Sequence, residues 1–211
     1  MPSISATKAL DRLRDGNARY VAGDLSHGDL THSARRNELV DGQSPFAVIL
    51  GCSDSRAPVE LVFDQGLGDL FVIRVAGNIV APSQIGSIEF AVAEFGVQLV
   101  VVLGHSNCGA IEATIDAVND KEHTYSKNLD FIVNRVRPSV EPLLSGESLP
   151  DRAVLLKKAT ELNVSASVQQ LRHGSDILEN LVTEGQLKIV GAKYSLDTGV
   201  VDFFEGLPEG A

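Results

Sequence analysis

The feature that most constrains this chain is a set of three continuous apolar runs, each of strand length. The runs cover Phe46–Gly51, Asp69–Val75 and Gln98–Gly104. Runs of this kind are typical of parallel strands that are covered on both faces. Helical patterns at Ser83–Phe95 and Cys108–Val118 follow the second and third runs, as in strand–helix–strand units. We therefore expect an α/β fold, with a central, mostly parallel β-sheet flanked by helices.

The flanking segments are predicted to be mainly helical. Ser3–Ala22 has an amphipathic pattern that Gly23 can close. Its core signature is weak, so we expect this helix on the domain surface or on a partner. His27–Gly42 is polar and predicts irregular structure or a second short helix.

The second half of the chain is predicted to hold helices followed by two strands. Tyr125–Leu181 has mainly helical patterns, and we expect breaks at Pro138, Pro142, Ser145-Gly146 and Pro150. The closing strands are expected at Leu187–Leu196 and Val200–Phe204, joined in a hairpin by Thr198-Gly199.

Composition and charge argue against several classes of function. The chain has 211 residues, of which 44 % are hydrophobic and 22 % charged, which is ordinary for a globular domain. Its net charge of −10 repels phosphate backbones, so we expect no nucleic-acid partner. No apolar run has the length of a membrane span, and the first residues lack the pattern of a signal peptide. We expect no membrane partner and a cytoplasmic location, where both cysteines would stay reduced.

Potential metal ligands follow two of the predicted strands. Cys52 comes directly after the first apolar run, and His105 and Cys108 come after the third. Sites in open α/β sheets form at the carboxyl ends of strands, and thiolate and imidazole ligands suit Zn²⁺. Two inert buried thiols, a core histidine or a disulfide would also fit these positions.

Asp54 and Arg56 form a second informative pair beside Cys52. Residues i and i+2 of an extended segment point to the same face. A carboxylate and a guanidinium placed in this way can form a bidentate hydrogen bond. The pair could serve a metal site, or it could be a structural salt bridge at a strand end.

At this point the chain resembles the β-carbonic anhydrases, in particular the plant-type subclass. The resemblance covers most of the chain and rests on ordered motifs. They are Cys52-Ser-Asp-Ser-Arg56, Gly68-Asp-Leu-Phe-Val-Ile-Arg-Val-Ala-Gly-Asn78, Ser87-Ile-Glu-Phe-Ala-Val92 and His105-Ser-Asn-Cys108-Gly-Ala. Val75 and Ala57 depart from the family pattern, and Ala57 puts the choice of substrate in some doubt.

The resemblance implies a zinc enzyme that hydrates CO2 reversibly to bicarbonate and a proton, by attack of zinc-bound hydroxide. It implies Zn²⁺ on Cys52, His105 and Cys108, with Asp54 and Arg56 as a catalytic dyad and Asp54 as a fourth ligand in a closed state. It also implies that Gln43, Phe71, Phe90 and Gly109 contact the substrate. From the sequence alone, Phe71 and Phe90 would be assigned to the core.

The resemblance further implies a homodimer or homotetramer, in which one of the two phenylalanines reaches the partner's site. We expect one domain over 1–211, with an N-terminal helical arm (1–42), a zinc-binding βα core (43–120), and a helical segment with closing strands (121–211). Two alternatives stay open: a hydrolase of carbonyl sulfide or carbon disulfide on the same scaffold, and a non-catalytic protein with a structural zinc.

Overall fold

The computed structural model of the chain describes residues 4–26, 32–120, 122, 124–145 and 151–207. Its five strands form one sheet in the order β2-β1-β3-β4-β5. They are β1 (Ala47–Gly51), β2 (Leu70–Arg74), β3 (Leu99–His105), β4 (Lys188–Tyr194) and β5 (Val201–Glu205). The first four run parallel, and β5 is antiparallel to β4. The predicted α/β fold with a mostly parallel sheet is confirmed.

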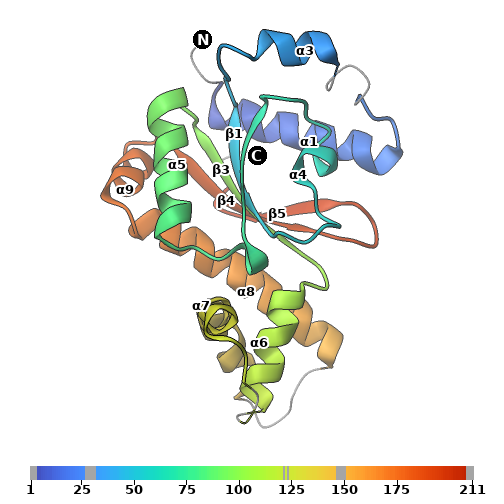
Figure 1. Cartoon of the computed structure of the whole chain (residues 1–211), viewed down its shortest axis with the longest axis vertical. Helices are drawn as coiled ribbons and strands as arrows, with labels where there is room; N and C mark the ends of the chain where they lie inside the picture. The colour runs from blue at the N-terminus through green and yellow to red at the C-terminus, as the bar shows by residue number, and fades with distance from the viewer. Residues whose placement is uncertain (1–3, 27–31, 121, 123, 146–150, 208–211) are drawn as a thin grey trace.

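Helices cover both faces of this sheet (Figure 1). Those in the described residues are α1 (Ala6–Ala22), α3 (Ser33–Glu38), α4 (Val59–Val62), α5 (Pro82–Phe95), α6 (Gly109–Asn119), α7 (Lys127–Leu144), α8 (Arg152–His173) and α9 (Asp176–Thr183), with a short 3₁₀ turn, η1 (Ala76–Asn78). Helices α1 and α4 pack on one face, and α5, α8 and α9 pack on the other. None of the helices in these ranges combines the length and the hydropathy that a membrane crossing needs.

Strand β1 shows why the predicted strands are continuously apolar. Ala47 and Ile49 enter the core under α1, whereas Val48 and Leu50 enter the core under α5 and α8. Successive side chains of a strand point to opposite faces, so a strand with two cores needs apolar residues at every position. A third cluster joins α6, α7 and α8 and contains both cysteines.

Helix α1 belongs to the chain's own core, and the expectation of a surface or partner helix is wrong. Ala9, Leu10 and Leu13 are completely buried against the sheet. Asn17 is also buried, and its side chain donates to the carbonyl groups of Val62 and Gly199. A polar residue thus occupies part of the core face, which weakened the apolar pattern of the helix. Gly23 ends the helix with φ of +74°, as predicted.

The predicted breaks at Pro138 and Pro142 are also wrong, because α7 continues through both residues. Proline removes a backbone hydrogen bond and normally disrupts a helix interior. Here both prolines lie on the exposed side, where water can reach the carbonyl groups that lose their partners. The opposite side buries Val133, Val136 and Val140, and this packing holds the helix together.

The closing hairpin between β4 and β5 agrees with the prediction. Gly199 adopts φ of +76° in the connection, and its N–H donates to the carbonyl of Ser195. The predicted short helix before Gly42 is α3, whereas residues 27–31 of that segment lie outside the described residues.

Candidate metal centre

Two neighbouring strands bring the three predicted metal ligands to one edge of the sheet. Cys52 follows the last residue of β1, and His105 is the last residue of β3. The strands are parallel and directly paired, so their carboxyl ends meet. A tight turn follows His105, with Asn107 at φ of +53°. The turn brings back Cys108, which is the N-cap residue of α6.

The three side chains converge on one buried point. The sulfur atoms of Cys52 and Cys108 lie 3.9 Å apart, and the ligand atoms of both cysteines and His105 all lie within 4.8 Å of one another. A disulfide needs about 2.0 Å between its sulfurs, so the disulfide interpretation does not hold. Cys52 is 6 % exposed, and the other two are 1 % exposed. This spacing suits three ligands around one ion.

The imidazole of His105 presents one ring nitrogen to this point. Its Nδ1 lies 2.9 Å from the carbonyl oxygen of Ser106. A carbonyl only accepts, so Nδ1 carries the hydrogen in the neutral ring. Nε2 is buried and has no hydrogen-bond partner in the described part of the chain. A buried unpaired acceptor is costly, and a metal ion at this point would give it a partner.

The electrostatics of the group favour a bound cation. The hydrogen bond from the Cys108 thiol lowers the pKa of Cys52 to about 4, against the opposing effect of burial. The interaction with Cys52, together with burial, raises the pKa of Cys108. Burial lowers the pKa of His105, but the neighbouring Cys52, whose thiolate charge favours the protonated ring, outweighs it and raises the pKa. The site therefore stabilises positive charge beside a thiolate, and these residues fit a thiophilic divalent metal.

Asp54 and Arg56 form the bidentate pair that their spacing predicts. Arg56 Nε donates to Asp54 Oδ1 at 2.9 Å, and Nη2 donates to Oδ2 at 2.7 Å. These bonds hold the pKa of Asp54 well below its usual range. Asp54 Oδ2 lies 3.8 Å from His105 Nε2. A carboxylate thus stands next to the atoms that would hold a metal.

Arg74 is a residue of this site that sequence reasoning missed. It is the last residue of β2, and its Nε donates to the carbonyl oxygen of Cys52 at 2.8 Å. Its Nη2 donates to the carbonyl oxygen of Asp54 at 2.6 Å. The side chain therefore fixes the loop that carries both residues. The segment containing Arg74 carried part of the resemblance, but no sequence pattern identifies backbone carbonyls as its partners.

The η1 turn supports the cysteine from the other side. Gly77, at φ of +70°, donates its N–H to the Cys52 sulfur at 3.3 Å. A side chain at this position would have its Cβ 3.1 Å from the Cβ of Ala110. Asn163 of α8 donates to the Gly77 carbonyl at 2.8 Å. No pattern in the sequence predicts these long-range bonds.

The four predicted substrate residues are spread more widely over the chain. Gln43 is exposed and lines a surface hollow beside α3. Gly109 is the first residue of α6, next to Cys108, and a Cβ there would meet open space. Phe71 on β2 and Phe90 on α5 contact each other, with ring centroids 6.2 Å apart. Phe90 is 53 % exposed, so its assignment to the core is wrong.

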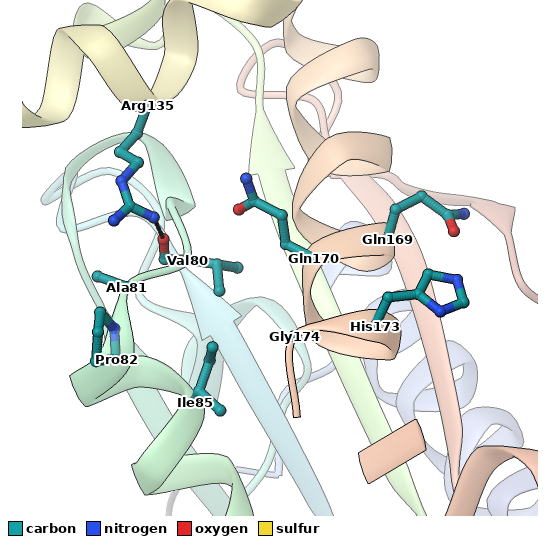
Figure 2. A pocket seen from close by; sticks show the side chains of 9 residues that line it. All are labelled: Val80, Ala81, Pro82, Ile85, Arg135, Gln169, Gln170, His173 and Gly174. Carbon is teal, nitrogen blue, oxygen red and sulfur yellow. Dashed lines mark hydrogen bonds between the residues drawn. The ribbon is translucent and has the colours of Figure 1, made fainter. Parts of the chain in front are cut away.

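A separate groove lies between α5, α7 and α8 (Figure 2). It holds about 580 Å³ and is lined mainly by apolar atoms of Val80, Ala81, Pro82 and Ile85. Arg135 extends from α7 toward the segment before α5 and donates to the Val80 carbonyl at 2.7 Å. None of the predicted site residues lines this groove, so the chemistry of the chain is centred on the cysteine–histidine group.

Fold and site together define a mostly parallel α/β protein with a cysteine–histidine–cysteine group that could hold a metal ion at the carboxyl ends of its strands. The family model described as carbonic anhydrase matches residues 47–201. Carbonic anhydrase 2 of Mycobacterium tuberculosis is 40 % identical over 199 residues, covering 94 % of this chain and 93 % of that protein. The carbonic anhydrase of Mycolicibacterium smegmatis is 40 % identical over 205 residues, covering 96 % and 95 %.

Solved structures show the same class. The β-carbonic anhydrase CafA of Aspergillus fumigatus superimposes with a TM-score of 0.73 at 25 % identity, covering 96 % of this chain and 91 % of that one. A tetrameric β-carbonic anhydrase of Sordaria macrospora superimposes with a TM-score of 0.70 at 26 % identity, covering 81 % of this chain and 85 % of that one. The chain belongs to the β-carbonic anhydrase family.

Proposed function

We propose that this chain catalyses the reversible hydration of CO2 to bicarbonate and a proton, with zinc held by Cys52, His105 and Cys108. The observation that carries the proposal is the unpartnered His105 Nε2, which lies beside two cysteine sulfurs and 3.8 Å from Asp54 Oδ2. Two thiolates and one imidazole form a known catalytic zinc set that leaves a fourth position open. A purely structural zinc would have four protein ligands and no need of the dyad.

Zinc, when bound, supplies a Lewis acid that lowers the pKa of a coordinated water. The chain's own residues then have to orient that water and CO2. Asp54 is ionised at neutral pH, as any ordinary aspartate is, and it stays ionised far into the acid range because Arg56 lowers its pKa. An ionised carboxylate only accepts hydrogen bonds. Asp54 would therefore take a hydrogen bond from the reacting oxygen and leave a lone pair of that oxygen facing the substrate.

Arg56 is a positioning residue in this proposal. Its guanidinium donates hydrogen bonds to both carboxylate oxygens of Asp54, and its Nη2 also donates to the Asn107 carbonyl at 3.0 Å. This last bond ties the dyad to the turn between His105 and Cys108. While Arg56 holds both oxygens, Asp54 is kept from acting as a fourth metal ligand, so the observed pairing supports an open site. Release of Arg56 would be required for a closed one.

A second copy of the chain would complete the substrate pocket. Phe71, Phe90 and Phe95 form an aromatic cluster at the edge strand β2, and Phe90 is half exposed. We propose that this cluster faces the metal centre of the partner and gives CO2 an apolar surface. Gln43 and the Gly109 N–H would contact substrate oxygens. A homodimer or homotetramer follows, and the Sordaria relative is described as tetrameric.

The relatives described above are all named carbonic anhydrases, which favours CO2 over the hydrolysis of carbonyl sulfide or carbon disulfide. That alternative has no support in these comparisons. We also propose a cytoplasmic location, and a single domain made of an N-terminal helical arm (1–42), a zinc-binding βα core (43–120) and a helical segment with closing strands (121–211).

Stopped-flow CO2 hydration by zinc-loaded protein tests the proposal. Asp54→Asn removes the carboxylate charge, and we expect turnover to fall by about 10²–10³ with zinc content unchanged, as for loss of one oriented group in an active site. Asp116→Asn is the matched control. Asp116 pairs with Arg152 at 3.1 Å on an exposed surface, and its loss should leave turnover unchanged. Full turnover of the Asp54 variant, or no turnover of the zinc-loaded parent, would refute the proposal.

A further inference from the structure

A second cavity lies behind the metal-binding turn, at the carboxyl edge of β3 and β4. It holds about 360 Å³ and is bounded by the turn after β3, the β4–β5 connection and the first half of α8. Cys52, His105 and Cys108 do not line it. Its polar lining residues are Ser106, Asn107, Lys157, Thr160, Lys193, Ser195 and Asp197. Carboxyl edges of parallel sheets are common places for ligands.

Two serine residues that line this cavity have hydroxyl groups free to donate hydrogen bonds. Ser106 Oγ accepts from the backbone N–H of Leu196 at 2.9 Å. Ser195 Oγ accepts from the backbone N–H of Thr198 at 3.2 Å. Each oxygen is thus oriented by a backbone donor, and each hydroxyl keeps its own hydrogen to give. Donors of this kind suit a ligand that accepts hydrogen bonds.

Two ammonium groups add positive charge to the same lining. Lys193 lies opposite Gly104 in the sheet, and its side chain is only 15 % exposed. It pairs with Glu161, which neutralises its charge but leaves further N–H donors. Lys157 lies at the rim and forms no ion pair within the described residues. Its charge is therefore the one available to an incoming anion.

We propose that this cavity binds a small ligand that carries an oxyanion group, such as a phosphate. The oxyanion would accept hydrogen bonds from Ser106 and Ser195 and would face the ammonium group of Lys157. Asp197 is exposed at the rim and would repel a second negative charge, but it can accept a hydrogen bond from a hydroxyl group. The ligand is thus a small hydroxylated phosphate or an equivalent oxyanion.

The site shares one wall with the metal centre. The carbonyl of Ser106 holds the His105 ring, and the carbonyl of Asn107 holds Arg56. A ligand in the cavity would contact Ser106 and Asn107 from the side opposite the metal centre.

Calorimetric unfolding of the zinc-loaded protein in phosphate and in chloride, at matched ionic strength, tests this site. A ligand that binds only the folded state raises Tm. We expect Lys157→Ala to raise the Kd for inorganic phosphate by about fivefold, the effect of one charge contact near the surface. Lys158→Ala is the matched control, because this neighbouring exposed lysine does not line the cavity. Both variants change only exposed side chains, so both should fold.

Inorganic phosphate and glycerol 3-phosphate distinguish two sources of the oxyanion. A larger rise in Tm with glycerol 3-phosphate, lost in Lys157→Ala, assigns a hydroxylated organic ligand. If the two compounds raise Tm equally, and both rises are lost in Lys157→Ala, the ligand of the cavity is a free inorganic anion. Equal rises in both lysine variants would place phosphate elsewhere and overturn the proposal. No rise in the parent protein would also overturn it.

Discussion

Gly104 offers a quantitative test of how the metal-binding strand is packed. It lies in β3 directly before His105 and opposite α8. A Cβ added at this position would stand 2.6 Å from Val164 Cγ2 and 3.2 Å from Thr160 Cγ2. Carbon atoms in contact prefer about 3.5–4.0 Å. Gly104→Ala therefore forces β3 and α8 apart by a substantial fraction of an ångström.

The cost can be estimated from the neighbours. Val164 is completely buried, and a valine in a helix has one strongly preferred rotamer, so it cannot turn away. Overpacking of this kind costs about 1–3 kcal/mol. At about 2–4 °C per kcal/mol for a domain of this size, the expected fall in Tm is about 2–12 °C.

Val164→Ala provides the compensating change. Alone it should cost about 1–3 kcal/mol through lost burial and a cavity. Combined with Gly104→Ala it removes the clashing methyl, so the double variant should be more stable than the sum of the two single effects by about 1 kcal/mol or more. Denaturant unfolding of the four proteins measures this coupling. Gly42→Ala, where an added methyl meets no atom within 4 Å, is the control and should be neutral. Additive effects would refute the packing argument.

Three further predictions concern stability. Leu13→Ala should lower the free energy of unfolding by about 2–5 kcal/mol, because Leu13 is completely buried, whereas Val21→Ala, at a 46 % exposed position of the same helix, should change it by less than about 0.5 kcal/mol; equal effects in urea unfolding would contradict the burial of α1. Burial, with the hydroxyl of Tyr20, raises the pKa of Tyr194 from 10.0 to about 12. The tyrosine therefore ionises first in the unfolded state, and the free energy of unfolding should fall as pH rises between these two values. Tyr194→Phe should flatten that fall, and an unchanged pH profile would contradict the raised pKa of Tyr194. Burial acts to raise the pKa of Asp64, but hydrogen bonds from Arg19 and Ser26 outweigh it and lower the pKa. The resulting stability is present above the unfolded pKa of about 3.9 and is lost as pH falls through the lower folded value. The free energy of unfolding of Asp64→Asn should therefore fall less steeply with acid than that of the parent, and equal slopes would contradict the lowered pKa.

Much of the sheet could be predicted because its strands carry an unambiguous pattern. A strand such as β3, buried along its whole length, must be apolar at every position. The hairpin at Thr198-Gly199 could also be predicted from its local sequence, because the turn needs a residue with positive φ and Gly199 supplies it. The burial of α1 could not be predicted, because Asn17 satisfies distant backbone groups from within the core. Helix α7 was predicted to break because the sequence does not reveal that both its prolines face outward.

The metal-ligand positions were predictable for a related reason. Cys52 and His105 each follow an apolar run, and parallel pairing brings such positions together. The supporting bonds were not predictable. Arg74, Gly77 and Asn163 act on or through backbone groups far away in sequence, and such contacts leave no periodic or composition signal.

X-ray absorption at the zinc edge, on protein loaded with one zinc per chain, tests the central claim most directly. The account predicts two sulfur ligands at about 2.3 Å and one imidazole nitrogen at about 2.0–2.1 Å, with one further light atom that is not part of the protein. Cys108→Ser should lose one sulfur or the metal itself. A shell without sulfur, or an unchanged two-sulfur shell in the Cys108 variant, would contradict the assignment of Cys52, His105 and Cys108 as the zinc site.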